Sequence, residues 1–141
     1  MQMPDVNVLV YAHREETRNH QRYAKWLTDL ANGPEPFAAS ESVLQGFVRI
    51  VTNARIFDPP STTVQTFEFI DALVSRPTCS VIRPGPNHWG IFRRLCESGN
   101  LQGKIIADAA HAALAIESGC EWVTADTDFA RFSPPLRWLH L

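Results

Sequence analysis

The chain has 141 residues, of which 45% are hydrophobic and 20% charged, and its formal net charge is −2 at pH 7. This composition is typical of a folded soluble domain and excludes a disordered chain, while the slightly negative charge argues against a protein that coats nucleic acid nonspecifically. The three cysteines are widely spaced and form no CxxC pair, which argues against a disulfide framework or a zinc site and favours a reduced, cytoplasmic protein. We therefore expect a single domain over residues 1–141.

The predicted elements alternate between strands and helices along the chain. The first segment, residues 5–14, is expected to begin as a short buried strand and turn into a helix, although Asp5 is equally suited to cap a helix that begins at Val6. Apolar residues at spacings of three and four predict amphipathic helices, and short apolar runs between turn residues predict strands. We expect further helices over residues 20–30, 41–52, 64–74, 88–96 and 104–118 and a short one around residue 129, and further strands over residues 37–39, 79–82, 121–124 and 136–139.

This alternation predicts an α/β domain, with a parallel sheet of four to five strands that helices cover on both faces. Ligands of such sheets bind at the carboxyl ends of the strands, where the strand order reverses. Four acidic residues lie at or just beyond such ends: Asp5 after the first strand, Glu41 after the second, and Asp126 and Asp128 after the fourth. We expect the functional site along this edge of the sheet.

No segment is expected to cross a membrane. The sequence does not open with a basic region followed by an apolar core, as a secretory signal would. The most apolar later stretch, residues 105–116, is too short to span a bilayer and contains Asp108 and His111.

Asp108 is the one acidic candidate that does not follow a strand. It shares a helical stripe with Ile105 and Ala112, so its carboxylate lies on the apolar face that should pack against the sheet. For both Asp108 and Glu41 the alternative is an acid in the first turn of a helix, stabilised by the helix dipole. Four or five carboxylates at one edge would, however, repel one another and raise their own pKa values unless a cation neutralised them.

Ligands that are all carboxylate oxygens favour Mg²⁺, with Mn²⁺ as a second possibility. The five histidines are scattered and are expected to be surface or core residues, so no cluster of His or Cys favours zinc. The sequence also lacks a GxxxxGK[ST] phosphate loop, a GxGxxG dinucleotide fingerprint and a GxSxG nucleophile motif. This combination favours hydrolysis of phosphate esters by water that a bound metal ion activates.

The acidic residues lie in short motifs that follow one another along the chain: DVNVL (residues 5–9), SESVL (40–44), IADAA (106–110) and TADTDF (124–129), with GFVR (46–49) and NARIF (53–57) between them. In order and spacing these motifs resemble those of PIN-domain ribonucleases, and over essentially the whole chain they resemble the VapC toxins of bacterial toxin–antitoxin pairs. Pro4 departs from the pattern, because an apolar β-branched residue commonly precedes the first Asp; it shortens the hydrogen bonding of the first strand without removing the acid.

The resemblance implies a three-layer α/β/α PIN-like domain that cleaves RNA endonucleolytically with Mg²⁺ and inhibits translation or growth. The implied partners are a VapB-like antitoxin, an RNA substrate (tRNA, rRNA or mRNA) and a second copy of the chain in a homodimer. Arg49 and Lys104, each within two helical turns of an acid, are expected to contact RNA at the mouth of the site. The implied site consists of the catalytic and metal-binding acids Asp5, Glu41, Asp108 and Asp126, with Asp128 as a secondary metal ligand, and of Asn7 and Thr124, which would orient a carboxylate or a metal-bound water.

Two other functions stay open from the sequence. One is a metal-dependent nuclease that acts on DNA through the same acidic site. The other is a doubly wound, receiver-like module that binds Mg²⁺ without hydrolysis, although such a module would have paired acids after its first strand, where Val6 and Asn7 follow Asp5.

Two predicted helices carry more large apolar residues than one buried stripe needs, notably Trp26, Phe67 and Phe69. We expect a groove between the helices over residues 23–30 and 64–74, which would receive an amphipathic segment of the antitoxin. Packing of the same residues within the core is the alternative.

Overall fold

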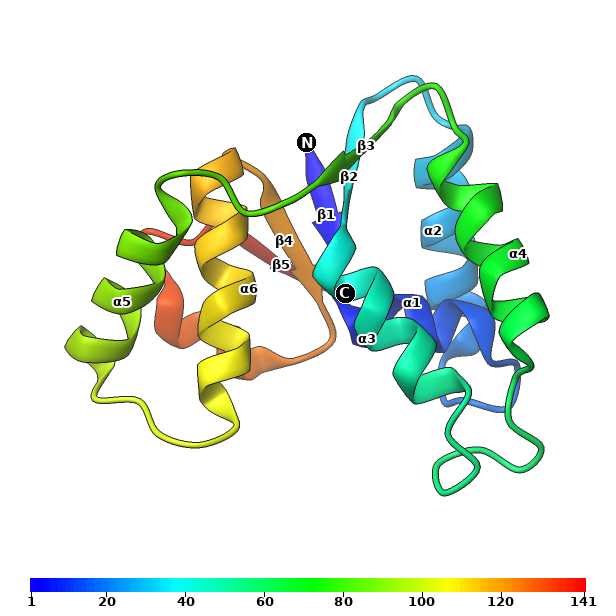
Figure 1. Cartoon of the computed structure of the whole chain (residues 1–141). Helices are drawn as coiled ribbons and strands as arrows, with labels where there is room; N and C mark the ends of the chain where they lie inside the picture. The colour runs from blue at the N-terminus through cyan, green and yellow to red at the C-terminus, as the bar shows by residue number, and fades with distance from the viewer.

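The computed structural model describes all 141 residues, and its centre is a five-stranded sheet in which neighbouring strands are parallel. The strand order is β3-β2-β1-β4-β5, and helices flank the sheet (Figure 1). This confirms the predicted α/β fold with a parallel sheet of four to five strands. The strands are β1 (Gln2–Pro4), β2 (Phe37–Ser40), β3 (Cys79–Ile82), β4 (Glu121–Thr124) and β5 (Trp138–His140).

The helices form two groups. One group, α1 to α4, packs together on one half of the molecule, and α5 packs on α6 in the other half (Figure 1). None of these helices combines the length and apolarity that crossing a bilayer requires. The helices are α1 (Val6–His13), α2 (His20–Asn32), α3 (Glu41–Val51), α4 (Thr63–Val74), α5 (His88–Gly99) and α6 (Ile105–Ser118), with a 3₁₀ helix, η1 (Thr127–Phe132).

Local signals fix several helix ends. The Ser40 hydroxyl accepts a hydrogen bond from the Val43 amide and begins α3, and Thr62 and Gln65 form a capping box at the start of α4. Gly119 ends α6 with φ of 68°, a left-handed conformation that a residue without a Cβ adopts at little cost.

The first segment differs from the prediction. The strand β1 lies before Asp5, and the apolar run after Asp5 is entirely helical, so the expectation of a strand beginning at Asp5 was wrong. The alternative was right, because Asp5 caps α1 and its carboxylate accepts a hydrogen bond from the Val6 amide. The helix α1 is largely buried, and a continuous apolar run of this length does not by itself separate a buried helix from a buried strand.

The place of β1 in the sheet decides where a site forms. This strand pairs with β2 on one side and β4 on the other, so the strand order reverses next to it. Pro4 is in register with Val123, which brings the carboxyl ends of β1 and β4 together. A crevice opens outside the strand ends at such a reversal. Beneath it lie Met3 and Trp122, both fully buried in the core.

Candidate active site

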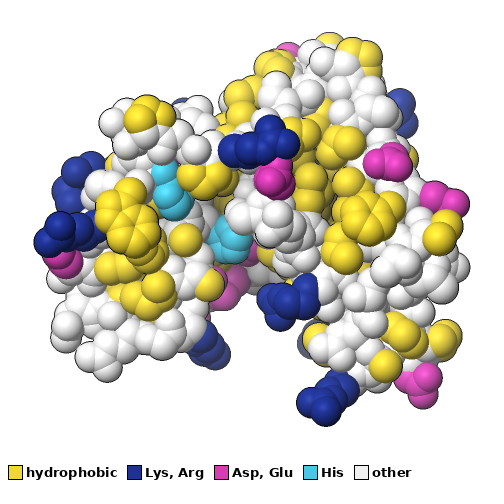
Figure 2. All heavy atoms as spheres, in the orientation of Figure 1, with side chains coloured by type: hydrophobic (Ala, Val, Ile, Leu, Met, Phe, Trp, Pro, Cys, Tyr) yellow, Lys and Arg dark blue, Asp and Glu magenta, His cyan; other side chains and the backbone are white.

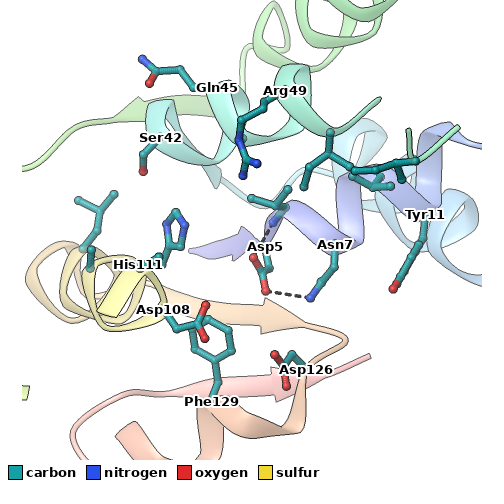
Figure 3. A pocket seen from close by; sticks show the side chains of 18 of the residues that line it. Asp5, Asn7, Tyr11, Ser42, Gln45, Arg49, Asp108, His111, Asp126 and Phe129 are labelled. Atoms are coloured by element: carbon teal, nitrogen blue, oxygen red, sulfur yellow. Dashed lines mark hydrogen bonds between the residues drawn. The ribbon is translucent and has the colours of Figure 1, made fainter. Parts of the chain in front are cut away.

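A cavity of about 880 Å³ lies at the carboxyl ends of the central strands, and three of the predicted acids line it: Asp5, Asp108 and Asp126. Asp5 follows β1, Asp126 follows β4, and Asp108 comes from the first turn of α6. Figure 3 shows these three side chains converging from their separate elements. In the space-filling view the same region is hollowed between the two halves of the molecule, with acidic and histidine side chains inside it (Figure 2).

The carboxylate of Asp5 is the most deeply buried of the three, with 6% of the residue exposed. Its Oδ1 accepts the Val6 amide at 2.6 Å, and its Oδ2 accepts the Thr124 hydroxyl at 2.6 Å and the Asn7 amide at 3.0 Å. A buried charge requires such partners, because desolvation otherwise costs several kcal/mol. The side chain therefore has a fixed orientation at the floor of the cavity.

Hydrogen bonds of Asn7 and Thr124 connect the segment after β1 with the turn after β4. The Asn7 side chain accepts the Ala125 amide at 3.1 Å and donates to the Thr124 hydroxyl at 3.2 Å. That hydroxyl also accepts the Asp126 amide at 3.0 Å. Both residues thus contact the backbone or side chain of an acid, as residues that orient metal ligands do.

The electrostatics of the cavity favour neutralisation of its acids. Burial raises the pKa of Asp5 from 3.8 to about 6, and the nearby charges of Asp108 and Asp126 add to this rise, although the hydrogen bonds to Asp5 oppose it. Burial also raises the pKa of Asp108, as do the charges of Asp126 and Asp128, while Arg131 and Lys104 lower it. The repulsion expected from clustered carboxylates is present.

Two predicted acids, Glu41 and Asp128, do not line the cavity. Glu41 does not line the cavity and instead pairs with Arg83, the residue after β3. Asp128 is exposed and outside the cavity wall, although its backbone amide donates to the Asp126 carboxylate at 2.8 Å. Their assignment as metal ligands stays a prediction.

The donor set suits a hard cation. Asp5, Asp108 and Asp126 offer only carboxylate oxygens, which Mg²⁺ and Mn²⁺ prefer. As the side chains stand, no group of three or more Asp, Glu, His or Cys residues is arranged to enclose a metal ion. A Mg²⁺ ion keeps several waters and binds through one or two carboxylates together with substrate phosphate, so it does not require a complete cage of protein ligands.

The helix α3 forms the facing wall of the cavity. Ser42, Gln45 and Arg49 line it, and Figure 3 shows the Arg49 side chain extending toward Asp5. Gly46 lies on the same helix, and a Cβ there would stand 3.1 Å from the Val6 side chain of α1. The helices α1 and α3 therefore approach closely at this point. Lys104, the other predicted RNA contact, is exposed before α6 and does not line the cavity.

Two histidines that the sequence analysis assigned to surface or core belong to the opposite wall. His88 and His111 line the cavity; the Nε2 of His88 lies 2.9 Å from the Ala110 carbonyl, and the His111 ring stacks on Trp122. Burial lowers the pKa of His111, and His88 lowers it further. The spacing of His111 three residues after Asp108 places both on one helical face, a signal that was available in the sequence.

A model of the PIN domain family matches residues 3–133. The chain belongs to the PIN-domain family. Ribonuclease VapC43 of Mycobacterium tuberculosis is 46% identical to it over 136 residues, which cover 96% of this chain and 92% of that protein. Ribonuclease VapC31 of the same species is 38% identical, with 94% of this chain and 97% of that protein covered. The predicted membership among VapC-type PIN proteins is confirmed.

Solved structures agree with this fold. VapBC2 from Rickettsia felis, bound to a DNA fragment from its promoter, matches with a TM-score of 0.72 at 22% identity and covers 99% of this chain and 97% of that one. VapC20 of Mycobacterium tuberculosis, a toxin that cleaves the sarcin–ricin loop, matches with a TM-score of 0.67 at 12% identity, with 94% and 95% covered. At these identities the likeness shows the PIN fold, here with its parallel sheet and flanking helices.

The raised pKa of Asp5 predicts an observable titration. In EDTA the side-chain carboxyl carbon of Asp5 should titrate with a midpoint of about 6, and Mg²⁺ should lower that midpoint because a cation favours the charged form. Since the folded-state pKa lies above the ordinary 3.8, the stability that Asp5 contributes without metal is fully present below 3.8 and is lost as pH rises through about 6.

A carbon-detected NMR titration with and without Mg²⁺ measures both effects. Glu117 is the internal control, because its carboxylate accepts the Gly85 and Asn87 amides at the surface, which hold its pKa below the ordinary value. Its midpoint should not respond to Mg²⁺. A midpoint for Asp5 at the ordinary 3.8 would contradict the electrostatic description of the site.

Proposed function

We propose that this PIN-domain protein is a Mg²⁺-dependent endoribonuclease that acts as the toxin of a VapBC toxin–antitoxin pair and thereby inhibits translation or growth. The observation that carries the proposal is the convergence of Asp5, Asp108 and Asp126 on one cavity, with raised pKa values for the first two. A divalent cation bound between these carboxylates would offset their mutual repulsion and so stabilise the arrangement. The relatives VapC43 and VapC31, both named ribonucleases, support RNA as the substrate.

Asp5, Asp108 and Asp126 would hold the cation, and Glu41 would join them after release from Arg83. A bound Mg²⁺ would supply a water of lowered pKa and would neutralise charge on the phosphodiester that this water attacks. The chain's own part is orientation. Hydrogen bonds from Thr124 and Asn7 keep the Asp5 carboxylate fixed, so little reorganisation accompanies binding.

The wall facing the acids would bind the RNA backbone. Arg49 extends into the cavity from α3, and a guanidinium suits the paired oxygens of a phosphate. Its positive charge offsets the repulsion between the acids and the RNA. His111 is held uncharged at neutral pH by burial, so it adds a hydrogen-bonding group without adding charge.

The proposed antitoxin site is a separate groove between α2 and α4. It has a volume of about 150 Å³, and Leu27, Ala31 and Ala72 are among its lining residues. Phe69 lines this groove and also packs against Phe47. Both alternatives predicted for Phe69, a place in the groove and packing in the core, therefore hold. Support for a VapB-like partner comes from the VapBC complex of Rickettsia felis, which shares the fold.

The two other residues expected at this groove do not line it. Trp26 packs against the core from α2, and Phe67 is 50% exposed on α4. The homodimer and the cytoplasmic location implied by the resemblance stay predictions.

The first test of the proposal is the amide variant of Asp108. Asp108→Asn should lower RNA cleavage by more than the roughly 10- to 100-fold typical of residues that merely support a metal ligand. In EDTA its melting temperature should be equal to or higher than that of the unaltered protein, because the change relieves repulsion with Asp126. Cleavage assays with Mg²⁺ on single-stranded RNA and on DNA of the same sequence, with melting curves in EDTA, measure both.

Asp71→Asn is the matched control, since Asp71 is exposed on α4 away from the cavity. It should leave cleavage unchanged. Retained cleavage by Asp108→Asn together with a clear loss of stability would assign Asp108 a structural role. Cleavage of DNA in preference to RNA would favour the DNA nuclease that the sequence left open.

A second test separates the two predicted RNA contacts. In the Asp108→Asn background, Arg49→Ala should make the log–log dependence of RNA binding on salt shallower by about 0.7 for one phosphate contact on a single strand. Lys104→Ala should change it less, because Lys104 stands outside the cavity. Fluorescence anisotropy over a series of salt concentrations measures the slope. Equal slopes for both variants and the parent would place the RNA-binding surface elsewhere.

A third test concerns the antitoxin groove. Ala72 is exposed and lines the groove, so Ala72→Trp should fill it without disturbing the core and should weaken the binding of a VapB-like antitoxin by at least about tenfold, which corresponds to about 1.4 kcal/mol. Val64→Trp, on the same helix but outside the groove, is the control. Isothermal titration calorimetry measures the affinity, and equal affinity for both variants would exclude this groove. RNA cleavage should be the same in both.

A further inference from the structure

We propose that Tyr11, Ile56 and Phe57 form a subsite that stacks on an unpaired base of the RNA, next to the phosphate held at the acidic centre. This inference deepens the proposed ribonuclease function and rests on it. The three side chains line the same cavity as Asp5 and Asp126, so a strand bound there would be continuous between the two regions. The subsite contains no charged side chain of its own.

Tyr11 stands along α1 from the acidic centre. Asn7, which bonds to the Asp5 carboxylate, lies one helical turn before it, so the two side chains share a helix face at a separation of about 6 Å along the axis. Figure 3 shows Asp5, Asn7 and Tyr11 in this sequence along the cavity. The Tyr11 ring is supported by an edge contact with Tyr23 at 5.1 Å between centroids.

Ile56 and Phe57 belong to the connection between α3 and α4. Ile56 is 53% exposed, which leaves a large apolar side chain in water at the mouth of a cavity. Removing apolar surface from water is favourable, so the exposure of Ile56 marks a surface that would be stabilised by a bound apolar group. A nucleobase has a flat face that can cover this surface.

The connection is held in place by hydrogen bonds. The amides of Ile56 and Phe57 both donate to the Asn53 carbonyl at 3.0 Å. Arg14 lies over the Phe57 ring at 4.5 Å and donates to the Pro59 carbonyl at 2.8 Å. Phe57 lines the cavity and Arg14 does not. A preorganised ring loses little conformational entropy when a base stacks on it.

The occupant follows from this chemistry. Single-stranded RNA is recognised largely through unstacked bases that lie on aromatic rings, whereas a duplex keeps its bases inside. Stacking accepts any base, because every base has a π-face. The subsite therefore selects an unpaired nucleotide beside the scissile phosphate and contributes little to the choice among the four bases.

Binding of a short fluorescent single-stranded RNA by the Asp108→Asn protein in Mg²⁺ tests the inference. Phe57→Ala should weaken binding by about fivefold to about a hundredfold, the range for loss of a base–aromatic stack, and Ile56→Ala, which removes only an aliphatic contact, should weaken it measurably but less. The same RNA backbone without bases should bind the parent and both variants equally. Val64→Ala, a truncation of an aliphatic side chain that is 67% exposed on α4, should bind both RNAs like the parent.

The two failures are distinguishable. If the parent binds neither strand and the unaltered protein cleaves no RNA, the proposed function falls and the subsite falls with it. The other failure is that RNA is bound and cleaved, but the variants bind the strand with bases as tightly as the parent does, or lose the same affinity for both strands. In that case only the subsite is overturned. Melting curves guard against misfolding of Phe57→Ala, and the exposed Ile56→Ala decides the outcome where Phe57→Ala is unstable.

Discussion

The structure depends on one buried carboxylate. Asp5 follows β1, caps α1 and accepts a hydrogen bond from the hydroxyl of Thr124 in β4, so the same side chain that would bind a cation also connects three elements. Its hydrogen bonds lower its pKa while burial and neighbouring charges raise it, and the raised value shows that burial prevails. The fold thus keeps an electrostatically unfavourable group at its centre, as active sites commonly do, and a divalent cation would remove the cost.

The sheet order explains why residues far apart in sequence meet at this carboxylate. Because β1 lies between β2 and β4, the turns after β1 and β4 open into the same crevice, and α6 contributes Asp108 from its first turn. The Asn7 and Thr124 hydrogen bonds then fix the separation of Asp5 from the Asp126 turn. The chemistry of the site is therefore coupled to the pairing of two central strands, and a change in either strand would move the acids apart.

The two proposed binding surfaces are separate, but both are formed by helices of the group α1 to α4. The proposed RNA cavity is lined in part by α1 and α3, whereas the proposed antitoxin groove lies between α2 and α4, which pack against those same helices. An aromatic cluster connects α1, α3 and α4: Phe69 of α4 lines the groove and contacts the rings of His13 and Phe47. A partner in the groove would thus touch side chains that support the helices of the cavity wall.

The sequence by itself determined most elements and gave the candidate acids. Strong local signals such as Ser40, Thr62 and Gly119 set helix ends without tertiary help. The acidic motifs pointed to Asp5, Glu41, Asp108 and Asp126, and all of these except Glu41 line the cavity. Only the tertiary structure decided that the run after Asp5 is a helix, because burial on all sides erases the periodicity that separates helix from strand. It also decided which polar side chains face the cavity: Glu41 pairs with Arg83 while Gln45 and His111 line the wall. Those choices depend on the rotation of each helix against the sheet and on rotamers, which contacts between distant segments fix and a spacing pattern along one chain leaves open.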